Sequence, residues 1–112
     1  MKAISIKEPY ASMIRRGEKL IETRTWKTDY RGDLLLCASQ KPESDISGKA
    51  FAVAKLADCV PMTTEHEAQA GCKVYPGAYA WILRDVTAIM VFPVKGQLSL
   101  FEVDVPLRLK HG

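Results

Sequence analysis

The sequence is poor in the residues that bind metal ions or form crosslinks. It contains three cysteines and two histidines among 112 residues, with no Cys-x-x-Cys pair and no Cys/His set at metal-ligand spacing. Cys37 and Cys59 lie in the apolar runs LLLCAS and KLADCV, so we expect buried, reduced thiols rather than a Cys59–Cys72 disulfide. We therefore expect neither a metal nor another cofactor.

The two histidines do not change this expectation. His66 stands between Glu65 and Glu67 in a predicted helix, where adjacent side chains point about 100° apart, so the three cannot converge on one ion. A solvent-facing helix surface is the simpler interpretation. His111 lies in the terminal sequence LKHG, where we expect a mobile tail.

Long apolar runs are also missing. None approaches the ~18 residues of a membrane span, and the opening MKAISIKEPY lacks the apolar centre of a signal peptide. We therefore expect a cytoplasmic protein without membrane contact. The chain has no Gly-x-Ser-x-Gly motif, no glycine-rich phosphate loop, no internal repeat and no linker.

What remains is the composition of one soluble globular domain spanning residues 1–112. The hydrophobic share is 47% and the charged share is 26%, which argues against disorder. The net charge of +3 is compatible with a phosphate-bearing partner. It is too small for a dedicated binder of long duplexes and favours a short ligand.

Hydrophobic patterning and turn residues predict six or seven short strands and two short helices. The strands are predicted at residues 3–6, 20–26, 34–39, 49–62, 78–92 and 98–109, and the helices at 8–16 and 63–70. In the first helix Pro9 fits the first turn and Gly17 the exit. In the second, Thr64 and Glu67 have capping-box spacing and Gly71 lies at the exit. Within the fifth strand, AYAWIL also fits a helix, and Trp81 is predicted in the core.

The predicted fold class is α+β and mainly β. A sheet of this many strands in a small domain avoids exposed edges by closing on itself. We therefore predict a small, mainly antiparallel β-barrel with two or three short helices over an end or side.

The segment GEKLIETRTW, residues 17–26, combines opposite charges with an aromatic ring. Alternation in a strand puts Glu22, Arg24 and Trp26 on one face. Arginine matches phosphate or a base edge, and Trp26, with Tyr10 on the preceding helix, offers stacking surfaces. Lys19 can bind phosphate or, if desolvated, act as a base. Taken alone, the segment is better explained as a solvent-exposed strand with one weak ion pair.

Gly17, Lys19, Glu22 and Arg24 form the pattern G-x-K-x-x-E-x-R, which resembles the signature of the ASCH domain family in the PUA-like superfamily. Further segments agree in order: SIKEPYASMI, YRGDLLLCAS, GKAFAVAKLADC, YAWILRDV and FPVKG. The resemblance covers nearly the whole chain. It implies a PUA-like β-barrel with a cleft between barrel and helices, RNA binding and, in some members, deacylation of N4-acetylcytidine or ribonuclease activity.

The family's amidohydrolases use a lysine, a threonine and a glutamate. Lys19 matches the lysine, whereas Glu22 stands where that threonine would be. We expect the adjacent Thr23 to face the other side of the strand, and the second carboxylate to correspond to Glu65 or Glu67. Ser39, with Gln40 and Lys41 nearby, is predicted at the cleft rim. The predicted ligand-binding set is Tyr10, Gly17, Lys19, Glu22, Arg24, Trp26 and Ser39, with Lys19 and Glu22 catalytic if the protein is an enzyme.

Three functions follow from this reading. The first is a module that binds RNA or a modified nucleotide in the cleft. The second is a small hydrolase that deacylates N4-acetylcytidine-like nucleosides, with Lys19 as base, or a ribonuclease. The third is a protein-interaction adaptor whose cleft is only structural. We place binding ahead of catalysis because Glu22 replaces the threonine.

Overall fold

The structure is a computed structural model that describes residues 1–106. Strands dominate it, as predicted, and the short helices lie between them. The elements are β1 (Lys2–Ile6), α1 (Tyr10–Arg15), β2 (Ile21–Arg24), β3 (Gly32–Ala38), β4 (Lys49–Pro61), the 3-10 helix η1 (Thr64–His66), α2 (Glu67–Ala70), β5 (Tyr79–Pro93) and β6 (Phe101–Glu102). The segment AYAWIL is therefore strand, in β5.

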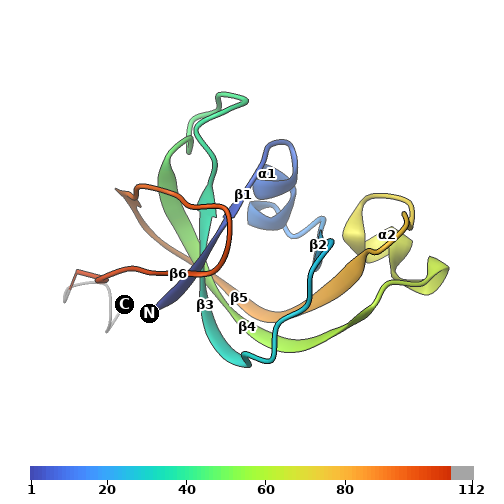
Figure 1. Cartoon of the computed structure of the whole chain (residues 1–112). Helices are drawn as coiled ribbons and strands as arrows, with labels where there is room; N and C mark the ends of the chain where they lie inside the picture. The colour runs from blue at the N-terminus through green and yellow to red at the C-terminus, as the bar shows by residue number, and fades with distance from the viewer. Residues whose placement is uncertain (107–112) are drawn as a thin grey trace.

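The six strands form one strongly bent sheet in the order β2-β5-β4-β3-β1-β6 (Figure 1). β1 and β3 run parallel, and the other neighbours are antiparallel. β2 and β6 are the edges, so the sheet is open within the described residues and the predicted closure into a barrel is not confirmed. Both edge strands are short: β2 pairs only with Tyr79–Ile82 of the long β5, and β6 has two residues.

α1 connects β1 to β2, and it ends at the predicted glycine but begins later than predicted. The Glu8 carboxylate accepts hydrogen bonds from Ser12 N at 2.7 Å and from Ser12 Oγ at 2.5 Å, which satisfies a free amide of the first turn. Gly17, at φ +78°, takes the left-handed conformation that ends the helix. Pro9 lies one residue before the helix rather than inside its first turn.

The second helical segment begins one residue earlier than the predicted capping box. Thr63 is the N-cap of η1, and its N–H donates to His66 Nδ1 at 3.0 Å. The first turn is a 3-10 turn. The two residues that form the capping box are Thr63 and His66 rather than the predicted Thr64 and Glu67. Gly71, at φ +71°, ends α2 as predicted.

Apolar side chains fill both faces of the sheet. Alternation along β1 and β3 sends Ile4, Ile6, Leu34 and Leu36 to a cluster under α1, which also contains Phe51 and the fully buried Trp81. Ala3, Leu35 and Cys37 point to the opposite face, where Phe92 and Phe101 join them. Cys37 is buried as predicted, Cys59 is only half-buried, and all three cysteines are free thiols.

The C-terminal strand is much shorter than predicted. Only Phe101 and Glu102 pair with β1, and Leu98, before them, is 96% exposed. The rest of the predicted strand, from residue 107, and His111 lie outside the described residues. Within residues 1–106 no helix is both long and apolar enough to cross a bilayer.

Candidate functional site

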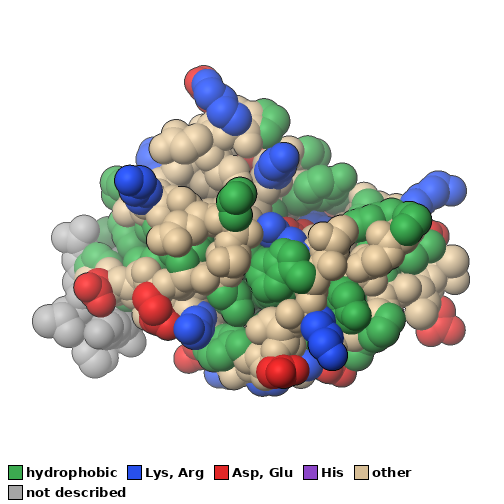
Figure 2. Space-filling view, in the orientation of Figure 1, with side chains coloured by type: hydrophobic (Ala, Val, Ile, Leu, Met, Phe, Trp, Pro, Cys, Tyr) green, Lys and Arg blue, Asp and Glu red, His purple; other side chains and the backbone are tan. Residues whose placement is uncertain are grey.

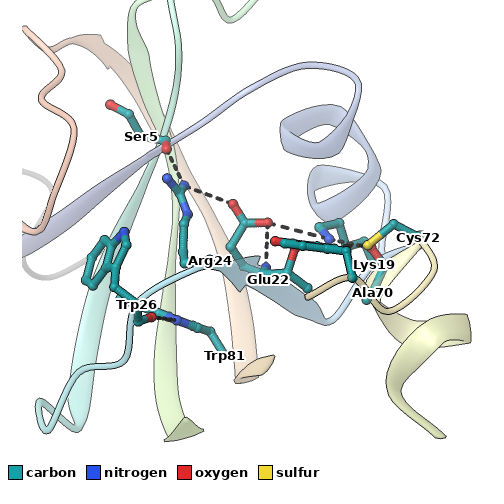
Figure 3. Close-up of polar contacts among 10 residues, drawn as sticks. Ser5, Lys19, Glu22, Arg24, Trp26, Ala70, Cys72 and Trp81 are labelled. Carbon is teal, nitrogen blue, oxygen red and sulfur yellow. Dashed lines mark hydrogen bonds and ion pairs between the residues drawn. The ribbon is translucent and has the colours of Figure 1, made fainter. Parts of the chain in front are cut away.

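The site is centred on Glu22 in the edge strand β2. Glu22 is 7% exposed, and its carboxylate lies between two cations (Figure 3). Oε2 accepts a hydrogen bond from Arg24 Nη2 at 2.9 Å, and Oε1 is 3.5 Å from Lys19 Nζ. Oε1 also accepts from the N–H of Thr23 at 3.1 Å. Both oxygens of Glu22 are therefore engaged, so this carboxylate holds the two cations in place.

Lys19 is the most deeply buried charged residue of the described chain. It precedes β2 and is 1% exposed, and its ammonium donates to the carbonyl of Ala70 at the end of α2. The ammonium also lies 4.9 Å from the centroid of the Tyr10 ring, on α1. Burial lowers the pKa of Lys19 below its ordinary value, and the nearby Glu22 carboxylate partly offsets this effect.

Arg24 connects the site to the neighbouring strand β1. Its Nη2 donates to the carbonyl oxygen of Ser5 at 2.5 Å as well as to Glu22. Its Nε is buried and has no hydrogen-bond partner among the described residues; the same holds for the Ser5 hydroxyl. Unpartnered buried polar atoms are rare in proteins, and their occurrence at one junction is typical of a site that takes a ligand or water.

These side chains line a cavity of about 340 Å³, which we call the Lys19 cavity. Its lining residues are Lys7, Tyr10, Lys19, Glu22, Thr23, Arg24, Cys72 and Tyr75. Figure 2 shows a hollow on this face of the molecule, with basic and acidic side chains at its floor and hydrophobic side chains beside it. The lining includes three cations, Lys7, Lys19 and Arg24, and a single carboxylate, so it carries a net positive charge.

Thr23 also lines this cavity, although alternation along β2 places it on the opposite face of the strand from Glu22 and Arg24. Its Oγ1 accepts a hydrogen bond from the Tyr75 hydroxyl at 3.0 Å and is 4.0 Å from Cys72 Sγ. β2 is an edge strand with no strand on its outer side, so side chains from both of its faces border the hollow. Cys72 and Tyr75 come from the segment after α2, and no local pattern in the sequence links them to β2.

Trp26, Gly17 and Ser39 are not among the residues that line the Lys19 cavity. β2 ends at Arg24, so strand alternation does not extend to Trp26. The Trp26 ring instead packs edge-to-face against Trp81, with centroids 4.9 Å apart. Gly17 ends α1, and Ser39 lines a separate cavity that also contains Ser5. Their predicted binding roles remain predictions.

The carboxylates considered as a second catalytic group also lie elsewhere. Glu67 accepts a hydrogen bond from Val74 N at 2.7 Å and thereby holds the segment that follows α2. Neither it nor Glu65 lines the cavity. Glu22 is therefore the carboxylate that the fold brings to Lys19.

The fold matches solved structures along most of its length. The ASCH protein of Zymomonas mobilis superposes with a TM-score of 0.64, and two single-site mutants of it superpose at 0.71 and 0.72. Each match covers 92% of this chain and 87–89% of the other, at 16% sequence identity. These matches show that the two proteins share a fold. No curated protein matches the sequence. The ASCH domain model matches residues 4–93, and the chain belongs to the ASCH domain family.

Proposed function

We propose that this ASCH chain binds RNA or a modified nucleotide, and that one nucleotide occupies the Lys19 cavity. The observation that carries the proposal is the combination of two tyrosines with three cations around a hollow of about 340 Å³. Aromatic rings stack on bases of any sequence, and cations hold the phosphate beside them. Membership in a family generally associated with RNA binding supports the same conclusion.

The contacts already made within the protein indicate which groups remain for a ligand. Glu22 is buried and both of its oxygens are engaged by neighbours, so we assign it to positioning Lys19 and Arg24 rather than to the base edge. Arg24 uses Nη2 for its two internal bonds, and no internal bond among residues 1–106 uses its Nη1. Nη1, the exposed Lys7 and the Tyr75 ring are therefore the groups that we assign to phosphate and base.

Calorimetric titration with short single-stranded RNAs and a panel of modified nucleosides tests the proposal. Tyr75→Ala should weaken binding about tenfold, since loss of one stacking surface costs about 1–3 kcal/mol. Val74→Ala is the matched control, because Val74 is exposed to a similar degree but does not line the cavity. Affinity for RNA should fall as salt rises. If neither RNA nor nucleosides bind, the proposal fails and a protein-interaction role becomes the better explanation.

A second candidate is hydrolysis of an acylated nucleoside such as N4-acetylcytidine. It is favoured by the lowered pKa of the buried Lys19 and by the Thr23 hydroxyl in the same cavity. Addition of water to the acyl carbonyl and cleavage of its bond to N4 would yield cytidine and acetate, with the neutral Lys19 amine accepting a proton. Chromatography would detect cytidine, and Lys19→Met should abolish its release. If no cytidine forms when the nucleoside is bound, this candidate is excluded.

A further inference from the structure

A second, smaller cavity lies next to the Lys19 cavity, across strand β1. It has a volume of about 240 Å³ and includes Ser5, Ser39, Gln40, Gly96, Gln97 and Leu98 in its lining. We call it the Ser39 cavity. No charged residue lines it, whereas the Lys19 cavity is lined by three cations and a carboxylate. The two hollows are therefore suited to different parts of a ligand.

Ser5 and Arg24 form the junction between the two cavities. The Ser5 carbonyl accepts from Arg24, which lines the Lys19 cavity, while the Ser5 side chain points away from Arg24 and lines the Ser39 cavity (Figure 3). The two buried side-chain atoms without a partner in residues 1–106, Ser5 Oγ and Arg24 Nε, belong to these same two residues. Such atoms normally have partners, so their location indicates that something other than the described chain completes this junction.

The chemistry of the Ser39 cavity suits a nucleobase. The amides of Gln40 and Gln97 and the hydroxyl of Ser39 supply both donors and acceptors without charge. Leu98 is 96% exposed at the rim and offers an apolar surface that nothing in the described chain covers. On the inner side of the cavity, Gly96 lets the backbone pass close to the Ser5 side chain, because a Cβ at position 96 would collide with Ser5 Oγ.

We propose that the Ser39 cavity is a second base subsite, so that the ligand is a single-stranded oligonucleotide of at least two nucleotides. One nucleotide occupies the Lys19 cavity and the next base occupies the Ser39 cavity. The phosphodiester between them crosses the Ser5–Arg24 junction, where Arg24 supplies positive charge. This inference rests on the proposed function, because it requires the Lys19 cavity to bind a nucleotide.

The test compares mononucleotides with the corresponding dinucleotides by calorimetric titration at constant salt. The four homodinucleotides are used in both ribo and deoxyribo forms, which distinguishes RNA from DNA as the source of the strand. The parent protein should bind at least one dinucleotide about tenfold more tightly than its mononucleotide, as expected for one additional stacked base. The double variant Gln40→Ala/Gln97→Ala should lose that advantage and keep the mononucleotide affinity.

The variants are chosen so that a folding defect cannot be mistaken for a binding defect. Gln40 and Gln97 are exposed and their side chains make no hydrogen bond with the described chain, and Gln69→Ala is the matched control outside both cavities. Equal affinity for mono- and dinucleotides, or equal weakening of both in the double variant, would overturn the second subsite and leave the Lys19 cavity intact as a site. Absence of binding to any nucleotide would overturn the proposed function and the subsite together.

Discussion

The Glu22→Gln substitution tests whether the Glu22 carboxylate stabilises the folded protein by compensating the buried charges of Lys19 and Arg24. Glu22 lies 2.9 Å from Arg24 Nη2 and 3.5 Å from Lys19 Nζ. At an effective dielectric constant of about 20, the attraction is roughly 6 kcal/mol for Arg24 and roughly 5 kcal/mol for Lys19 before desolvation is subtracted. Removal of one partner from a buried ion pair leaves the other charges uncompensated and costs about 3–5 kcal/mol. Because the glutamine oxygen can still accept from Arg24, we expect a loss near 3 kcal/mol.

Glu18→Gln is the matched control for this experiment. Glu18 pairs with Arg16 at 2.9 Å, the same distance as in the Glu22–Arg24 pair, but both side chains are more than half exposed. An exposed pair is worth about 0–1 kcal/mol, so this variant should unfold almost like the parent. Urea unfolding followed by tryptophan fluorescence gives both unfolding free energies. The dependence of the free energy on urea concentration should be the same in each variant if the folded and unfolded states expose the same surface. A Glu22→Gln loss as small as that of Glu18→Gln would refute the reasoning.

The pH dependence of the Glu22→Gln loss provides an independent check. Burial already lowers the pKa of Lys19, and Glu22 opposes that effect, so the pKa falls further in the variant. A lysine with a lowered folded-state pKa binds fewer protons in the folded than in the unfolded protein. Its contribution to stability therefore rises with pH between that lowered pKa and the ordinary value of 10.5. The difference in unfolding free energy between the parent and Glu22→Gln should therefore become smaller from pH 7 to pH 10. A difference that stays constant with pH would show that Lys19 is not involved.

Two further predictions concern a buried thiol and a glycine. Burial raises the pKa of Cys37 to about 12, so a thiol reagent at pH 8 should modify Cys59 and Cys72 in the folded protein and Cys37 only after denaturation; rapid labelling of Cys37 in the native state would contradict its burial. Gly17→Ala should cost about 1–2 kcal/mol of folding stability from left-handed backbone strain, since no atom lies within 4 Å of the added Cβ. Nucleotide affinity should stay unchanged in that variant, and a loss of affinity in calorimetric titration would instead support the predicted binding role of Gly17.

Local patterns predicted most of the elements correctly. Period-two alternation and apolar runs located β1, β3, β4 and β5, and the glycines at positions 17 and 71 marked both helix exits. These signals succeed because a strand face or a helix end is determined by a few neighbouring residues. The openness of the sheet was not predictable in this way, because it depends on how far β2 and β6 extend and on where they meet distant partners.

The candidate site shows the same division between local and distant information. The signature residues Lys19, Glu22 and Arg24 do meet, since they are close in sequence and precede or lie in one strand. The distant wall, with Cys72 and Tyr75, could not be inferred because the segment after α2 shares no periodicity with β2. Strand alternation could not place Trp26, because β2 ends two residues before it and its ring packs against Trp81; its predicted binding role stays a prediction.

The position of β1 between β3 and β6 has a consequence for how the chain folds. The amino group of Met1 donates to the carbonyl of Val103, 102 residues away, beside the short β1–β6 ladder. Closing a loop of that length costs roughly 4 kcal/mol of chain entropy. During synthesis, at about 5–20 residues per second, β1 can dock on β3 early but must wait for β6. Of the six described strands, the one that is synthesised first is thus among the last to acquire its second neighbour.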